Sequence, residues 1–184
     1  MRVALGVAVA CLLACGRDEL PVAGDGGATP AGPAPLRALA VAAGASHSCA
    51  LLESHRVKCW GKGAAGQLGY GDGYRRGSGP GQMGNGLPFV DLGTGRTATA
   101  IAAGGDATCA ILDDGSVKCW GDGALTGQPG ADDVGDGPGE MGDALPALDL
   151  GAGRAATRLV VSSRNACALL DDATARCWGA DAPA

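Results

Sequence analysis

Short apolar runs separated by Gly- and Asp-rich stretches recur along this chain, and helical periodicity is almost absent. The runs at 40–44, 100–104 and 158–162 open three similar units, each continuing into a short hairpin that ends in Trp-Gly. After the first two hairpins a long polar connection leads to a last apolar segment, at 87–93 or 145–151. Short runs bounded by Gly, Asp and Pro are typical of strands. The pattern predicts an all-β fold with about four short strands in each unit.

Six of the eight cysteines follow one spacing that occurs three times. Each pair is ten residues apart, and Trp-Gly follows its second member; the pairs are Cys49 and Cys59, Cys109 and Cys119, and Cys167 and Cys177, followed by the structural tryptophans Trp60, Trp120 and Trp178. Self-similarity at a nearly fixed period is the signature of a repeat protein. The cysteines therefore belong to a regular scaffold.

The middle repeat indicates that each pair forms a disulfide. Its loop, Asp113-Asp114-Gly115, favours a hairpin with Gly in the left-handed conformation. With this loop Ile111 pairs with Val117, and Cys109 lies directly opposite Cys119, within disulfide reach. The same register places Cys49 opposite Cys59 and Cys167 opposite Cys177. Each bridge should stabilise its hairpin by about 2–3 kcal/mol in the chain-entropy estimate.

Three alternatives to disulfides remain open for these cysteines. Zinc binding favours close clusters such as Cys-x-x-Cys, which the sequence lacks. A catalytic thiol needs a neighbouring base, and the second and third repeats contain no histidine. Free buried thiols, as in a cytosolic protein, are the third alternative.

The two faces of the hairpin both carry apolar side chains. One face holds Cys109, Ile111, Val117 and Cys119, and the other holds Ala110, Leu112, Ser116, Lys118 and Trp120. A small sheet of this kind must be covered on both sides, and propellers achieve this by stacking sheets next to one another. We expect Lys118, like Lys58 and Arg176, to lay its stem over the Trp and to keep its charge in water.

The first fifteen residues have the features of an export signal. Arg2 precedes a continuous apolar run at 3–14, which is too short to span a membrane. Leu12-Leu13-Ala14-Cys15-Gly16 resembles the bacterial lipoprotein signal, a resemblance that implies lipidation of Cys15. The alternative is an ordinary secretory signal cleaved nearby. Either signal implies export to an oxidising compartment, where disulfides persist.

The organisation that follows is a signal peptide at 1–15, a flexible Pro/Gly/Ala-rich tether at 16–37, repeats at 38–179 and a tail at 180–184. The lipid on Cys15 would place the protein in the bacterial cell envelope, as an outer-membrane lipoprotein or at the cell surface. With the alternative signal the protein would be secreted.

The repeats resemble the regulator of chromosome condensation repeat family. The resemblance rests on Cys-Ala-Leu-Leu at 49–52, Val-Lys-Cys-Trp-Gly at 57–61 and Gly-Gln-Leu-Gly-Tyr-Gly-Asp at 66–72, and is strongest to a Cys-containing version in exported bacterial proteins. It implies a β-propeller of four-stranded blades, commonly seven. The eukaryotic namesake exchanges nucleotide on a small GTPase and binds chromatin. An exported chain would not meet that GTPase, and a net charge of −5 argues against nucleic acid.

The repeat units fall at about 38–97, 98–155 and 156–179, too few to close a ring. We therefore expect a partial or truncated propeller of about three blades with disulfides inside the hairpins. Two alternatives are completion by self-association and a different small disulfide-stapled β arrangement.

The long connections contain much of the acid of the repeats but no recognisable catalytic motif. Gly-Asp loops can hold calcium, yet no calcium-loop spacing occurs, and solvated turns explain the same composition. His47 and His55 resemble strand-end and loop residues rather than metal ligands. We thus expect no catalytic residue, metal or cofactor.

The function predicted from these features is that of a non-enzymatic, exported and lipid-anchored module that binds an unknown protein partner through its loops. One alternative is an inhibitor or binder of an exported hydrolase, since some exported bacterial propellers of related architecture bind hydrolases such as β-lactamases. Another is a hydrolase whose site is built from loops.

Overall fold

The computed structural model describes residues 35–128, 130 and 132–180. The expected signal peptide, the lipidation site Cys15 and most of the tether lie outside the described residues. The described residues belong to the unit Pro35–Ala184.

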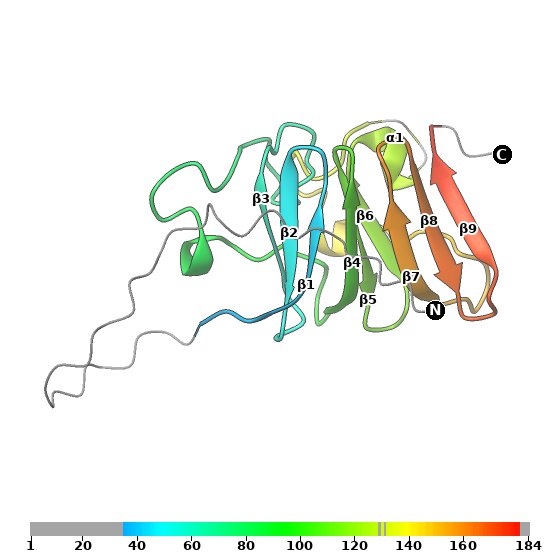
Figure 1. The fold of residues 1–184 in the computed structure, drawn as a ribbon. Helices are drawn as coiled ribbons and strands as arrows, with labels where there is room; N and C mark the ends of the chain where they lie inside the picture. Colours follow the sequence, from blue (N-terminus) through cyan, green and yellow to red (C-terminus); the bar gives the residue numbers. More distant parts are fainter. Residues whose placement is uncertain (1–34, 129, 131, 181–184) are drawn as a thin grey trace, which may run out of the picture. The chain divides into compact units, whose positions relative to one another are not determined.

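In the described part of the chain, nine strands form three separate antiparallel sheets that follow one another in sequence (Figure 1). The first contains β1 (Ala38–Ala43), β2 (His47–Leu52) and β3 (Val57–Gly61); the second β4 (Ala98–Gly104), β5 (Ala107–Leu112) and β6 (Val117–Gly121); the third β7 (Ala156–Val161), β8 (Asn165–Leu170) and β9 (Ala175–Gly179). Short helical turns occur in the connections: η1 (Gly84–Gly86), α1 (Gly123–Thr126) and η2 (Gly142–Ala144). The all-β expectation is confirmed.

Within each sheet the second and third strands form the predicted hairpin. In the second sheet Ile111 pairs with Val117 and Cys109 with Cys119. All three hairpins carry the expected disulfide, between Cα atoms 4.0–4.1 Å apart. Gly115 has the left-handed conformation that the loop requires, with φ of 81°. The same position is occupied by His55 (φ 58°) and Ala173 (φ 65°) in the other two hairpins.

Each sheet has three strands, so the expectation of four strands in each unit is wrong. The segments at 87–93 and 145–151 run beside β3 and β6, but each is tied by one backbone hydrogen bond, from Val90 N to Val57 O and from Leu148 N to Val117 O, both 2.8 Å. A proline in each segment, Pro88 or Pro146, has no N–H to offer a ladder. These extended segments close the outer edge of their sheets without becoming strands.

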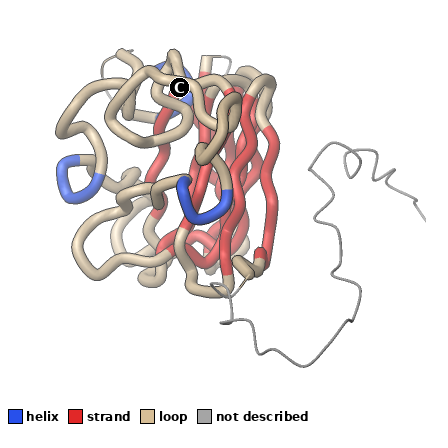
Figure 2. Tube along the Cα trace, turned by 90° about the vertical axis from the view of Figure 1, so that its left-hand side faces the viewer, coloured by secondary structure: helices blue, strands red, loops and turns tan. Residues whose placement is uncertain are grey.

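The core lies between consecutive sheets. The face of the first sheet that bears the Cys49–Cys59 disulfide packs against Ala110, Leu112 and Trp120 of the second. The disulfide face of the second sheet packs in the same way against Ala168, Leu170 and Trp178 of the third. The two hairpin faces predicted from the sequence therefore pack against each other at both seams, as neighbouring blades do in a propeller. Figure 2 shows that the loops gather on one side of the stacked strands.

Candidate functional site

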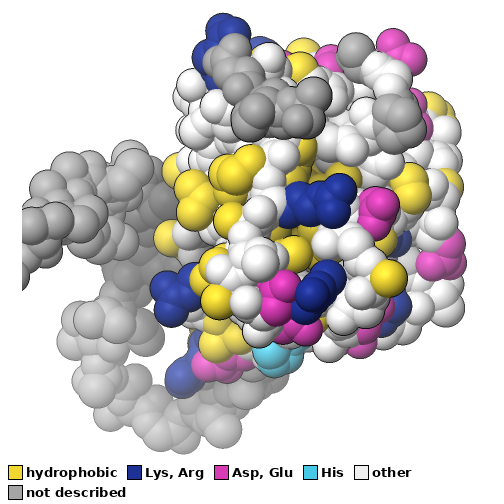
Figure 3. Space-filling view, turned by 90° about the vertical axis from the view of Figure 1, so that its right-hand side faces the viewer, with side chains coloured by type: hydrophobic (Ala, Val, Ile, Leu, Met, Phe, Trp, Pro, Cys, Tyr) yellow, Lys and Arg dark blue, Asp and Glu magenta, His cyan; other side chains and the backbone are white. Residues whose placement is uncertain are grey.

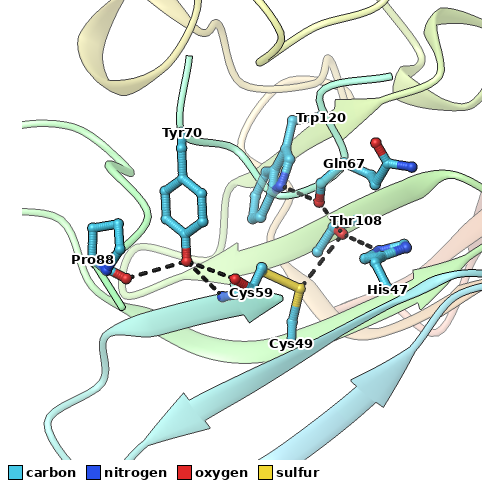
Figure 4. The surroundings of a disulfide bond; sticks show 8 residues. All are labelled: His47, Cys49, Cys59, Gln67, Tyr70, Pro88, Thr108 and Trp120. Atoms are coloured by element: carbon cyan, nitrogen blue, oxygen red, sulfur yellow. Dashed lines mark hydrogen bonds between the residues drawn. A yellow bond between two sulfur atoms is a disulfide. The ribbon is translucent and has the colours of Figure 1, made fainter. Parts of the chain in front are cut away.

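The seam between the first and second sheets contains a buried polar cluster (Figure 4). Thr108 on β5 is fully buried, and its hydroxyl donates to the carbonyl of Gln67, 3.0 Å away. Trp120 Nε1–H donates to the same carbonyl at 3.1 Å. His47 Nε2 lies 2.8 Å from the Thr108 hydroxyl. Because the Thr108 hydroxyl donates its proton to Gln67 O, it can only accept from His47. Nε2 of His47 therefore carries a proton, and in the neutral ring Nδ1 carries none.

This arrangement favours the neutral form of His47. Its side chain is 3% exposed, and among the described residues Nδ1 has no hydrogen-bond partner. Burial lowers the pKa of His47, and the carboxylate of Asp106 opposes this only in part. The sequence interpretation placed His47 at a strand end, which is correct, but gave no sign that it contacts Thr108, 61 residues further along the chain.

The three structural tryptophans occupy equivalent positions with different surroundings. Trp120 is fully buried in the first seam. Trp178 is half-buried and donates through Nε1 to Leu125 O at 2.9 Å, as Trp120 does to Gln67. Trp60 is also half-buried. Trp120 and Trp178, on the second and third sheets, therefore each hydrogen-bond to the connection that follows the preceding sheet.

The basic residue before each second cysteine departs from expectation. Lys58 and Lys118 are only 5% and 8% exposed, instead of holding their charge in water. The Lys118 ammonium donates to Leu92 O and Gly142 O at 3.0 and 2.8 Å, and that of Lys58 donates to Gly84 O at 2.6 Å. Burial lowers the pKa of both. Arg176, the third member, is exposed as expected.

The two long loops, at 62–97 and 122–155, form a groove of about 440 Å³. We call it the loop groove, and its lining includes Tyr70, Asp72, Arg76, Pro88, Phe89, Asp91, Pro138 and Met141. Apolar, cationic and anionic groups thus meet in one concave surface.

Tyr70 anchors one wall of the loop groove to the first sheet (Figure 4). Its hydroxyl accepts from Cys59 N at 2.9 Å, and Cys59 O and Pro88 O lie 2.9 and 3.2 Å away as acceptors. Burial raises the pKa of Tyr70 to about 12. Arg76 lies over the Tyr70 ring, 5.4 Å from its centre, and pairs with Asp72 at 2.7 Å. These bonds fix the wall on the disulfide-bonded hairpin.

Acidic residues of the second loop bond to the backbone of both long loops. Glu140 accepts from the backbone N–H groups of Gly135 and Gly137, both at 2.8 Å, and these bonds lower its pKa. Asp143 accepts from Thr94 N of the first loop at 2.8 Å. These carboxylates accept hydrogen bonds from backbone N–H groups that have no strand partner in the irregular loops.

Neither a metal cluster nor a membrane-spanning helix is found in the described part of the chain. Within it no three or more His, Cys, Asp and Glu side chains are grouped so as to bind a metal ion. Its helices are also too short to cross a bilayer.

Comparison with known proteins agrees with this architecture. Residues 39–67 and 98–125 match the Regulator of chromosome condensation (RCC1) repeat. Over 88 residues, 47% of the chain, it is 41% identical to the ultraviolet-B receptor UVR8 of Arabidopsis thaliana, and this match spans 18% of that receptor.

Two solved structures show the fold. Yeast RCC1 (Prp20), crystallised with Kap60, superposes with a TM-score of 0.56 at 19% identity, over 78% of this chain and 32% of its own. Human WBSCR16 superposes with a TM-score of 0.57 at 20% identity, over 77% of this chain and 33% of its own. This chain therefore spans about a third of the length of these structures and adopts part of their propeller.

Proposed function

We propose that this chain of RCC1-type repeats is a non-enzymatic protein-interaction module that binds its partner in the loop groove. The observation that supports this most is the anchoring of the groove to a disulfide-bonded hairpin through Tyr70. A rigid scaffold with exposed loops is a common way to present a binding surface, because little conformational entropy is then lost on binding.

The groove lining suggests what the partner presents. Phe89 and Met141 offer apolar area, whereas Arg76 and Asp91 offer opposite charges within the same hollow. A partner segment with an apolar side chain between charged groups would complement this lining.

A photo-crosslinking residue at Pro138, an exposed position of the groove, tests the proposal. We expect it to capture a discrete partner from the exported protein fraction, and the same residue at exposed Tyr74, outside the groove lining, to capture none. Arg76→Gln should weaken capture, whereas Arg75→Gln, the neighbouring charge outside the groove lining, should not. Equal capture at Pro138 and Tyr74 would contradict the proposal, as would turnover of a substrate by the purified chain.

We propose further that the module is exported and lipid-anchored at Cys15. The support is the lipoprotein-like sequence at 12–16 together with three hairpin disulfides, which require an oxidising compartment. Metabolic labelling with a fatty-acid analogue tests this. Cys15→Ala should abolish the label, whereas Cys11→Ala, the matched control in the same apolar run, should retain it; label on both variants would refute the anchor.

A further inference from the structure

The outer edges of the first two sheets are covered by the same kind of segment. Beside β3 runs Leu87-Pro88-Phe89-Val90-Asp91-Leu92, and beside β6 runs Leu145-Pro146-Ala147-Leu148-Asp149-Leu150. In each, the fourth residue donates its N–H to the strand, and the two outer leucines are buried, at 2–5% exposure. The chain thus contains two copies of one docking mode: an extended Leu-Pro-x-apolar-Asp-Leu segment on the edge strand of a hairpin.

None of the described residues covers the equivalent edge of the third sheet. Ala175, Arg176 and Cys177 of β9 are exposed, whereas their counterparts in β3 and β6 are buried. Two hollows of about 620 and 300 Å³ flank β9, and both are lined by Leu150, Arg176 and Cys177. Figure 3 views the stack from this end and shows apolar side chains next to basic ones on its surface. Leu169 and Val160 of the same sheet are 38% and 67% exposed.

The basic residue of β9 also lacks the partner that its counterparts have. Lys58 and Lys118 each donate to a carbonyl just before the docked segment, Gly84 O and Gly142 O. Within residues 35–128, 130 and 132–180 the Arg176 guanidinium makes no hydrogen bond, and it lines both hollows. A free strand edge, two partly apolar hollows and a cation that makes no hydrogen bond to the described residues therefore coincide at one place.

We propose that the β9 edge binds an extended segment of a partner protein with the pattern Met-Gly-x-x-Leu-Pro-x-apolar-Asp-Leu. The apolar residue donates its N–H to Ala175 O, as Leu148 does to Val117 O. The leucines fill the flanking hollows, and the carbonyl of the Gly accepts from Arg176. This is strand addition at a free edge, with side-chain pockets that provide specificity. The surface is separate from the loop groove, so the inference goes beyond the function proposed above and can fail independently of it.

The test is an NMR titration of the full chain with a synthetic peptide that has the sequence of residues 141–151. We expect saturable shifts of the amides of Ala175, Arg176 and Cys177. N-methylation at the position of Leu148 removes the donated hydrogen and should weaken binding about three- to tenfold, the range for one neutral hydrogen bond. N-methylation at the position of Asp149, whose N–H makes no hydrogen bond to β6, is the matched control and should leave the affinity unchanged.

Variants of the protein provide a second readout. Arg176→Met keeps the apolar stem but removes the donors and should weaken the peptide several-fold, whereas Arg158→Met on β7 of the same sheet should not. Absence of saturable shifts at millimolar peptide would overturn the proposal. So would equal affinity of the peptide N-methylated at Leu148, or shifts confined to the loop groove. Shifts of the β9 amides that depend on protein concentration without peptide would also overturn it, because a second copy would then cover the edge.

Discussion

Replacing Thr108 by Val tests whether the buried polar cluster stabilises the seam between the first two sheets. Val has nearly the shape of Thr, with a methyl group in place of the hydroxyl, so the substitution removes the donor and acceptor without opening a cavity. The carbonyl of Gln67 keeps its hydrogen bond from Trp120 Nε1–H, at 3.1 Å. The N–H of His47, however, loses its acceptor at a site that is 3% exposed.

The expected cost follows from that single loss. A buried donor left without a partner costs about 1–3 kcal/mol, so we expect Thr108→Val to reduce the free energy of unfolding by about 2 kcal/mol. With a urea m-value of about 2 kcal/mol/M for a domain of this size, the midpoint should fall by about 1 M.

Urea unfolding with the disulfides intact, followed by tryptophan fluorescence, measures this shift. Thr157→Val is the matched control, because Thr157 is also on a strand and its hydroxyl also donates to a carbonyl, Leu169 O at 3.1 Å, but it is exposed. We expect the control to change stability by less than about 0.5 kcal/mol. If both variants shift the midpoint equally at an unchanged m-value, burial of the seam does not set the cost and the reasoning is wrong.

Three further predictions concern single positions. Burial lowers the pKa of His47, so the unfolded chain takes up the proton first as the pH falls below about 6.5, and the free energy of unfolding should decline there by at most about 1.4 kcal/mol per pH unit. In His47→Gln the urea midpoint should depend less on pH between about pH 7.5 and pH 5.5. An unchanged pH dependence would contradict this. Ala173→Gly should raise the free energy of unfolding by about 0.5–1 kcal/mol, because Ala173 has φ of 65°, whereas Gly115→Ala should lower it; thermal or urea melts that give the same sign for both would argue against left-handed strain. Under limiting reductant Cys167–Cys177 should open first, because Cys177 is exposed while the other four paired cysteines are fully buried; alkylation and mass spectrometry would reveal a different order if accessibility is not decisive.

The hairpins show how far local reasoning reaches. The loop at Asp113–Gly115 predicted the register that places Cys109 opposite Cys119, and the structure has that register. The alternation along β5 and β6 also predicted which side chains share a face, and these faces form the two cores. Both results depend on residues about ten positions apart, for which turn type and strand period are sufficient.

The extended segments show where such reasoning stops. Residues 87–93 and 145–151 have the composition of strands, and the sequence predicted strands for them. Their backbone follows the sheet edge but is tied to it by one hydrogen bond each, because Pro88 and Pro146 lack an N–H and the following aspartates turn the chain. The loop groove could not be predicted either, since its walls come from two loops of different repeats.

The pentapeptide Val-Lys-Cys-Trp-Gly occurs twice, at 57–61 and at 117–121, and separates the two levels of determination. In both places the sequence alone determined a strand, a disulfide to the cysteine ten residues before and a cation beside it. The tertiary structure decided that Trp120 is fully buried while Trp60 is half-buried, and that His47 meets Thr108. A hairpin forms from neighbouring residues, whereas burial at a seam depends on which sheet is stacked against it, and that contact joins residues some sixty positions apart.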